Sequence, residues 1–253
     1  MSLEYPTDLI NDPYFSVEID KFGSSPEPEK AIYLEQNICV NEDARDFQEK
    51  VRNLTAEECG NRIIKHQLGV EHWSVLNFAT ATLRFYGFPH SVMAQITRHR
   101  DSAFLCQSMR YTGKRFEDWA NSINGDIERL MYLRPVGTYT DRNGNKYEFT
   151  EEERTTELKN IIRLGVLGYL EAIESGQSYE MARGKLPYDF RQDFAVTGTI
   201  ENWFHLLDQR TKKDSQLEIR TLAYMALNEL EKWSPTLFSW YRKNRAGKAR
   251  LAP

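Results

Sequence analysis

Residues 98–113, RHRDSAFLCQSMRYTG, are the most informative stretch of this 253-residue chain. The stretch opens with RHR at residues 98–100, three side chains that are or can become cationic, and Ser108 and Arg110 follow after seven intervening residues. Arginine guanidinium groups bind phosphate through two parallel hydrogen bonds, and a serine hydroxyl beside backbone N–H groups can complete the cradle. The stretch therefore predicts a phosphate-binding site.

A basic segment surrounds this stretch in an otherwise acidic chain. Between Arg84 and Arg115, six Arg and Lys residues face a single acid, Asp101, so the segment carries a net charge of +5. The whole chain carries −4, which leaves −9 for the remainder. The arginines alternate with Phe, Met, Tyr, Ser and Cys rather than with other charges, which disfavours a merely solvated charged face. A basic island in an acidic protein predicts a small phosphorylated ligand rather than a polyanion.

The composition excludes several classes of protein. Hydrophobic residues make up 40% and charged residues 28%, which is ordinary for a globular protein and too apolar for a disordered chain. No run approaches the roughly 18 apolar residues of a membrane span, so we expect no membrane contact. The cysteines are widely spaced without a C-x-x-C pair, so we expect neither disulfides nor a metal site, and a cytoplasmic location. They are Cys39, Cys59 and Cys106.

Local signals predict one α+β domain spanning the whole chain. Thr55 and Thr150 each precede a glutamate at the spacing of a capping box, and Gly176 ends the second of these helices. Ser215 and Glu218 are expected to cap a later helix in the same way. The predicted helices cover residues 29–39, 56–67, 90–100, 150–176, 199–210 and 215–232, with a terminal helix from Pro235.

Strand signals are fewer than helix signals. Residues 75–85, VLNFATATLRF, are β-branched and aromatic and predict a strand that Gly87 and Pro89 would end. Residues 101–112 are predicted to be irregular. The Asn143-Gly144 pair lies between VGTYT and KYEFT and predicts a β-hairpin.

Four further motifs accompany the central stretch. HQLGVEHWSVLNF begins at His66, Gln95 stands three residues before Arg98, ARGKLP covers residues 182–187, and Arg210 precedes a helix containing Leu-Glu-Ile. In this order, and with RHR, seven residues and Ser-x-Arg between them, the motifs resemble those of the flavin-dependent thymidylate synthases. The resemblance is strongest over residues 62–233.

The resemblance implies a fold, a reaction and an assembly. The fold is a single domain over residues 1–253 with a central antiparallel sheet flanked by helices. The reaction is the reductive methylation of deoxyuridylate (dUMP) to thymidylate, with methylenetetrahydrofolate as carbon donor, NADPH as reductant and FAD as the hydride-carrying cofactor. The assembly is a homotetramer in which subunits share active sites.

The resemblance also implies roles for individual residues. Arg210 would be catalytic and would face the carbonyl and imide of uracil, favouring an anionic form of the ring. The residues implied to bind dUMP are Gln95, Arg98, Cys106, Gln107, Ser108, Arg110, Arg183 and Arg210. Those implied to hold FAD are Arg98, His99, Arg100, Glu71, Thr199 and His205. His66 and Tyr111 would lie in the vicinity of the folate and flavin, with Tyr111 beside the nucleotide.

Several positions depart from the family pattern. Ala103, Leu105 and Cys106 replace the usual Ser, Asn and Glu, and Thr199 and Glu201 stand where Asn and Arg are common. A carboxylate repels flavin phosphates, so we expect Glu201 to pair with an arginine instead of binding flavin. The first 50 residues also lack the family's Arg-Val-Ser-like segment.

The residue chemistry is compatible with a reaction that uses no cysteine nucleophile. None of the cysteines follows a proline, and Cys106 is expected to be a half-buried small apolar residue. Arg210 could instead polarise the uracil carbonyl with a permanent charge. Two other functions stay open: a catalytically impaired flavin- or nucleotide-binding homologue, and a non-enzymatic module that binds nucleic acid through the basic island.

Overall fold

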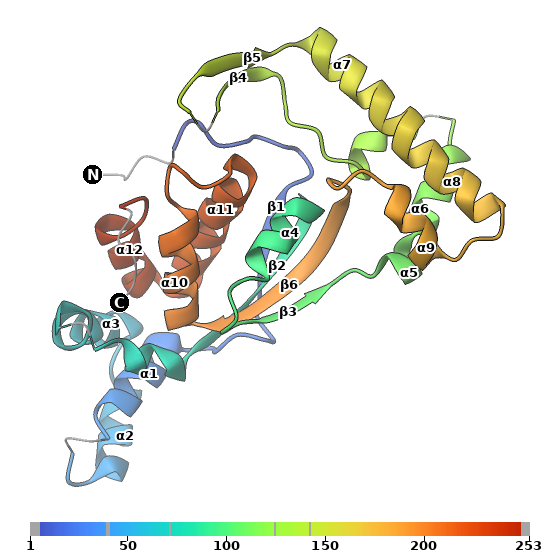
Figure 1. Cartoon of the computed structure of the whole chain (residues 1–253). Coiled ribbons are helices and arrows are strands. Elements are labelled where there is room, and N and C mark those ends of the chain that lie inside the picture. The colour runs from blue at the N-terminus through green and yellow to red at the C-terminus, as the bar shows by residue number, and fades with distance from the viewer. Residues whose placement is uncertain (1–5, 39–40, 71, 124, 142, 249–253) are drawn as a thin grey trace.

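The computed structural model describes residues 6–38, 41–70, 72–123, 125–141 and 143–248. A four-stranded antiparallel sheet of order β1-β2-β6-β3 lies at the centre, with helices packed around it (Figure 1). The strands are β1 (Ser16–Asp20), β2 (Thr80–Pro89), β3 (Ala103–Cys106) and β6 (Arg191–Thr199). This arrangement confirms the predicted α+β class and its central antiparallel sheet.

The strand predicted over residues 75–85 is wrong at both ends. Residues Trp73–Phe78 form a 3-10 helix, η2, and β2 begins only at Thr80. Asn77 explains the late start of β2. Its side chain forms hydrogen bonds with Thr199 and Glu201, so this residue does not continue the strand. Gly87 does not end β2, because the strand continues to Pro89. Gly87 adopts a φ of +71° at an irregularity in the pairing of β2 with β6.

Several elements were not expected from the sequence, among them the central strand β6, which pairs with both β2 and β3. Residues 101–112 are not irregular, because β3 pairs with β6 and is followed by the short helix α5 (Met109–Thr112). β1 lies in the turn-rich N-terminal region, and α2 (Ala44–Arg52) precedes the first capping box. Each of the three missed strands, β1, β3 and β6, is defined by pairing with a partner distant in sequence.

Most of the predicted helices are confirmed within a few residues of their expected limits. Cys39, at the end of the first predicted helix, lies outside the described residues. The helices are α1 (Pro28–Gln36), α3 (Ala56–His66), α4 (His90–Ile96), α10 (Ile200–Arg210), α11 (Leu217–Trp233) and α12 (Pro235–Asn244).

The cap predicted for α11 is wrong. Gln216 occupies the N-cap position without a side-chain capping bond, while the Ser215 hydroxyl donates to the backbone oxygen of Gln209. Glu218 is 2% exposed and forms an ion pair with Arg134 instead of closing a capping box.

The long helix predicted between Thr150 and Gly176 is interrupted by a wider turn. It consists of α7 (Glu151–Asn160), a π-helical turn, η4 (Ile161–Val166), and α8 (Leu167–Glu174). A Cβ on Gly165 would lie 2.3 Å from Pro187 Cδ, so the turn brings bare backbone against the ARGKLP segment. The preceding hairpin, β4 (Gly137–Thr140) and β5 (Lys146–Phe149), is confirmed.

Two hydrophobic clusters form the core. The larger one gathers the inner residues of β2 and β6 with α3, α10, α11 and α12. The smaller one lies around α8, α6 (Lys114–Ala120), α9 (Tyr179–Ala182) and the short helix η5 (Arg183–Lys185). We propose that both belong to one domain, because Met131 of the smaller cluster is followed directly by Tyr132 of the larger one, and Met131 pairs with Phe190 just before β6.

Arg191, at the start of β6, ties separate parts of the chain together. Its side chain is 3% exposed and forms an ion pair of 2.8 Å with Asp12, which is 4% exposed. It also donates to the backbone oxygens of Glu128 and Gly87, each at 2.6 Å. The guanidinium lies 4.9 Å from the ring centre of Tyr14. One buried cation thus joins the N-terminal segment, β2 and the loop before β4.

Candidate active site

Arg210 is held in place at the C-terminal end of α10. Its Nε donates to His99 Nε2 at 3.0 Å, and its Nη2 donates to the backbone oxygen of Gln95 at 3.4 Å. Burial, followed by the charge of nearby Arg98, lowers the pKa of Arg210, although a guanidinium stays charged at neutral pH. The structure therefore brings together four residues that the sequence motifs predicted, and it positions a permanent cation among them.

His99 is a buried neutral acceptor in this cluster. The residue is 7% exposed, and burial, followed by the charges of Arg210, His205 and Arg98, lowers its pKa to about 4. Its Nε2 accepts the Arg210 bond, so the remaining proton lies on Nδ1. The ring of His205 stands edge-on at 5.9 Å between ring centres.

The low pKa of His99 predicts a loss of stability in acid. Below about pH 6.5 the unfolded chain binds a proton that the folded chain refuses until about pH 4, so folding weakens as the pH falls through this window. We expect this residue to contribute up to about 3 kcal/mol to the loss. Urea unfolding at pH 7 and pH 4.5 should show a smaller loss for His99→Gln, which keeps an acceptor for Arg210 but does not titrate. An equal loss in both proteins would contradict the prediction.

Gln95 connects this cluster to the start of α11. Its Nε2 donates to Gln216 Oε1 at 2.5 Å, and Gln216 Nε2 donates to Glu218 Oε2 at 2.9 Å. Gln216 was not predicted to be a site residue, and Glu218 was predicted to cap a helix. Both residues lie in the segment that follows Arg210, and this position in the sequence could have indicated them as site residues.

A second cluster contains the other predicted phosphate ligands. Ser108 caps α5, with its hydroxyl accepting from the backbone nitrogen of Arg110 at 3.4 Å. Arg110 pairs with Glu180 of α9 at 2.8 Å, and Tyr111 is 82% exposed. Arg183 follows α9 directly and is exposed. Packing of α5 on α9 therefore gathers residues from two motifs that are far apart in sequence.

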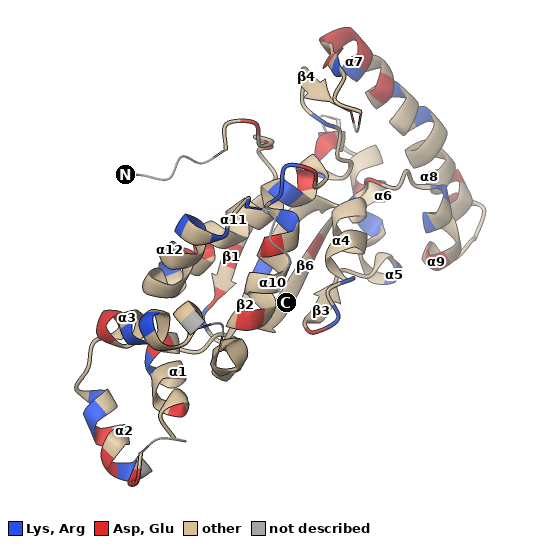
Figure 2. Cartoon of the chain, turned by 60° about the vertical axis from the view of Figure 1, so that its left-hand side comes forward, with Lys and Arg blue, Asp and Glu red and all other residues tan. Residues whose placement is uncertain are grey.

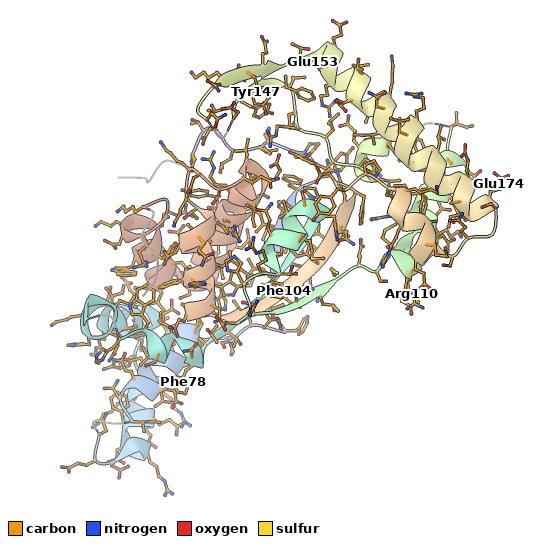
Figure 3. All side chains as sticks on the ribbon, in the orientation of Figure 1. Phe78, Phe104, Arg110, Tyr147, Glu153 and Glu174 are labelled. Carbon is orange, nitrogen blue, oxygen red and sulfur yellow. The ribbon has the colours of Figure 1, made fainter. Side chains whose placement is uncertain are left out.

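The two clusters lie at opposite ends of β3. The RHR segment precedes this strand and Ser108 follows it. Figure 3 shows Phe104 of β3 beneath α4, whereas Arg110 lies beyond the far end of the strand, on α5. No hydrogen bond or ion pair among the described residues joins Arg210 to Ser108, Arg110 or Arg183. Within a single chain the two groups of predicted site residues are thus separate.

Gln107 and Cys106 behave differently from each other at the end of β3. Gln107 Nε2 donates to Asp193 at 3.0 Å, and Gln107 Oε1 accepts from Arg115 at 3.3 Å, so both ends of its amide are engaged within the chain. Arg115 was not singled out by the sequence analysis. Cys106 is exposed, which corrects the expectation that it is half-buried.

The predicted flavin residues are distributed around α10 and the RHR segment. Thr199 caps α10, and its hydroxyl donates to Asn77 Oδ1 at 2.8 Å. His205 lies six residues later on the same helix and bonds Gln209. Glu201 accepts from Asn77 instead of the expected arginine, at 2.5 Å. His66 ends α3 and is exposed, while Glu71 lies outside the described residues.

The basic island of the sequence is not one surface patch. Arg84 pairs with Asp20 at 2.6 Å, Arg110 pairs with Glu180, and Arg115 donates to the backbone oxygen of Arg191 at 2.6 Å. Figure 2 shows basic residues spread over several helices, with acidic residues beside them on α2, α3 and α7. The side chains of Arg98 and Arg100 have no hydrogen bond or ion pair among the described residues.

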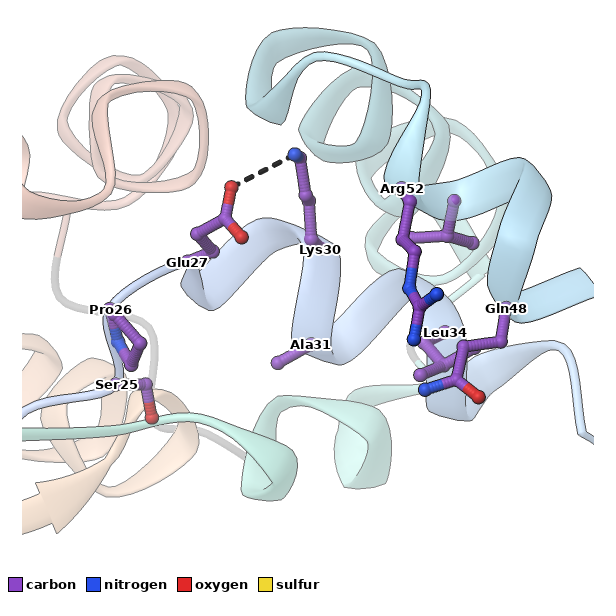
Figure 4. A pocket seen from close by; sticks show the side chains of 9 residues that line it. Ser25, Pro26, Glu27, Lys30, Ala31, Leu34, Gln48 and Arg52 are labelled. Carbon is purple, nitrogen blue, oxygen red and sulfur yellow. Dashed lines mark ion pairs between the residues drawn. The ribbon is translucent and has the colours of Figure 1, made fainter.

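Two pockets lie outside these clusters or at their edge. One of about 410 Å³ lies between α1 and α2, contains the Glu27–Lys30 ion pair, and includes none of the predicted site residues (Figure 4). Another of about 660 Å³ reaches Gln216 and Arg134. Within the described residues, no group of three or more His, Cys, Asp or Glu side chains could hold a metal ion. No helix in that part of the chain is long and apolar enough to span a membrane.

Comparisons with known proteins agree with the motifs. The family model described as thymidylate synthase complementing protein matches residues 22–236. A flavin-dependent thymidylate synthase of Haloarcula marismortui is 34% identical over 204 residues, covering 78% of this chain and 81% of the relative. The one from Halobacterium salinarum is 32% identical over 206 residues, covering 79% and 82%.

Solved structures share the fold. A UMP/dUMP methylase, PolB from Streptomyces cacaoi, bound with 5-Br UMP, has a TM-score of 0.65 at 16% identity, covering 96% of this chain and 100% of that one. Thymidylate synthase X from Helicobacter pylori, solved with FAD and dUMP, has a TM-score of 0.66 at 15% identity, covering 90% and 100%. Since the family model spans most of the sequence and the relatives align over most of both chains, this chain belongs to the flavin-dependent thymidylate synthase family.

Proposed function

We propose that this enzyme converts dUMP to thymidylate by reductive methylation, without a cysteine nucleophile. Methylenetetrahydrofolate would supply the carbon and NADPH the electrons, in the cytoplasm. The observation that carries the proposal is the Arg210 guanidinium, which His99 and the Gln95 backbone hold in a fixed position. A fixed cation facing the uracil carbonyl stabilises negative charge on the ring and so activates its carbon towards an electrophile.

The nucleotide phosphate is assigned to the second cluster. Ser108, Arg110 and Arg183 offer a hydroxyl and two guanidinium groups from elements that pack together. Arg110 is paired with Glu180 at the surface, and such exposed pairs contribute only about 0–1 kcal/mol, so a phosphate can displace the carboxylate. Arg98 would contact both nucleotide and flavin, and Cys106 and Gln107 are assigned to the same site.

The residues around RHR fit a flavin dinucleotide. The side chains of Arg98 and Arg100 are exposed and have no ion-pair partner among the described residues, so their charges are available to the flavin phosphates. His99, His205 and Thr199 border the same region, and we assign Glu71 and His66 to it from the motif. The flavin, when bound, supplies hydride transfer, while the protein orients and polarises the substrate.

We infer that complete sites require more than one chain, in a homotetramer. The phosphate cluster and the Arg210 cluster lie at opposite ends of β3, so a second chain would bring them together. Exposed apolar side chains near the phosphate cluster support an interface, because monomers rarely expose many of them in one region. They are Leu164, Leu167, Met181 and Tyr188.

Two measurements test the proposed function. The purified protein should take up FAD and show a flavin absorbance spectrum. It should then release tritium from dUMP labelled at the ring carbon when NADPH and methylenetetrahydrofolate are present. Flavin binding without tritium release would favour the impaired homologue. A colourless protein that takes up no FAD would favour the nucleic-acid module, which family membership and the dispersed basic residues already disfavour.

Cys106→Ala should leave the reaction intact. Cys106 is exposed on β3, and the proposed chemistry relies on Arg210 rather than a thiol. We expect tritium release within about threefold of the wild type. The fold should be retained as well, since a surface substitution changes stability by about 0.5 kcal/mol at most. Loss of turnover with flavin and fold retained would overturn the mechanism without a nucleophile. Cys59→Ala, a change inside α3, serves as a comparison for fold damage alone.

A further inference from the structure

A chain of two amides leads from the proposed uracil site to a buried carboxylate. Gln95 Nε2 donates to Gln216 Oε1 at 2.5 Å and to the backbone oxygen of Ser91 at 3.3 Å. Gln216 Nε2 then donates to Glu218 Oε2 at 2.9 Å. The backbone carbonyl and the carboxylate can only accept, so they dictate which end of each amide is the nitrogen. Gln95 Oε1 consequently has no hydrogen-bond partner among the described residues.

The carboxylate at the far end is held in its charged form. Glu218 is 2% exposed, and Arg134 donates to its Oε1 through Nε at 2.9 Å and Nη2 at 2.6 Å. Burial alone would raise the pKa of Glu218, but the Arg134 charge and hydrogen bonds hold that pKa below its ordinary value. Arg134 is itself fixed by the hairpin, over the Tyr139 ring at 4.8 Å and bonded to the Tyr147 hydroxyl at 3.1 Å.

The polar edge next to Arg210 therefore presents a defined pattern. Arg210 offers N–H donors, and its Nη2 already reaches the backbone oxygen of Gln95. The same residue, Gln95, carries a side-chain acceptor, Oε1, that no hydrogen bond among the described residues occupies. Uracil in its neutral form, in which the nucleotide binds, carries an N–H donor between two carbonyl acceptors, which complements this pattern. Cytosine carries an unprotonated ring nitrogen in place of that N–H, and two acceptors would then face each other.

We propose that Gln216 is a positioning residue that determines specificity for uracil over cytosine nucleotides. It acts through Gln95, by accepting from Nε2 and so keeping Oε1 turned to the base. The inference rests on the proposed function, because it assumes that the base lies between Arg210 and Gln95. A site built to satisfy a particular N–H discriminates strongly against a ligand that lacks it, since the acceptor is otherwise left unpaired.

The test compares two nucleotides on the FAD-loaded protein. Calorimetry gives the dissociation constants of dUMP and dCMP for the wild type and for Gln216→Met, which keeps the side-chain length but removes the acceptor and the donor. We expect the dCMP-to-dUMP ratio of dissociation constants to fall at least tenfold, and KM for dUMP to rise more than kcat falls.

The control and the contrary outcomes distinguish a failure of this inference from a failure of the proposed function. Gln48→Met makes the same change on α2, at an exposed position remote from the site, and should leave both constants unchanged. If Gln216→Met weakens both nucleotides equally and keeps the ratio, Gln216 has only a structural role and this inference is overturned while the proposed function stands. Wild-type protein that binds neither nucleotide would overturn both.

Discussion

Replacing Arg210 with alanine is expected to lower kcat by about 10²–10³-fold, the loss typical of removing one preorganised group that stabilises developing negative charge. The guanidinium is held by His99 and by the Gln95 backbone, so its position is fixed before substrate binds. FAD should remain bound, because we assign its phosphates to Arg98 and Arg100. Tritium release from labelled dUMP and the flavin spectrum measure the two effects separately.

A matched control exists for the Arg210 experiment. Arg52 also ends a helix, α2, and is exposed away from both clusters, so Arg52→Ala should retain full turnover. Arg210→Lys keeps the charge but loses the fork of donors that bonds His99 and Gln95 together, and should show an intermediate rate. Turnover of Arg210→Ala within threefold of the wild type would remove this residue from the mechanism.

The second large effect concerns folding. Arg191→Met should destabilise the protein by about 3–5 kcal/mol, because it leaves the carboxylate of Asp12 buried without its partner. For a chain of this size the midpoint of thermal unfolding should fall by about 10 °C or more. The Gly87 and Glu128 backbone oxygens lose their donors in the same variant, which adds to the loss. Thermal or urea unfolding monitored by circular dichroism measures it.

Two further variants identify the cause of the Arg191 effect. Removing both charges, in Arg191→Met combined with Asp12→Leu, should recover part of the stability, since no unpaired charge then remains buried. Lys232→Met breaks the exposed pair with Glu229 and should cost no more than about 0.5 kcal/mol. A cost below about 1 kcal/mol for Arg191→Met would show that the buried pair contributes little.

The parts of the fold that sequence predicted correctly depend on neighbours along the chain. The capping boxes at Thr55 and Thr150 and the Asn143-Gly144 turn are satisfied within four residues, and all three were found. The incorrect predictions concern residues whose conformation depends on a partner that is distant in the sequence. Asn77 forms hydrogen bonds with Thr199 and Glu201, so β2 begins later than predicted. Glu218 forms an ion pair with Arg134 and does not cap the helix as predicted.

The same distinction applies to the candidate site. Arg210, His99 and Gln95 were predicted separately from motifs, and the structure brings them into hydrogen-bond contact. The continuity of residues 98–113 suggested one phosphate site, but the segment between RHR and Ser108 contains a strand. An extended chain advances about 3.3 Å per residue, so seven residues can separate the two ends by roughly 20 Å. RHR and Ser108 are close in the sequence but apart in space, because β3 is an extended strand between them.

The π-helical turn between α7 and α8 makes the number of residues in this surface helix matter. Each residue of an α-helix rotates the next by about 100°, so one residue more or fewer would turn a different side chain towards Pro187. Gly165 now meets Pro187 with bare backbone, and its neighbours Leu164 and Val166 carry branched side chains that would push the segment away. That segment contains Arg183. Insertions and deletions in this surface helix would therefore shift Arg183, the residue that we assign to the nucleotide phosphate, whereas most substitutions along α7 would not.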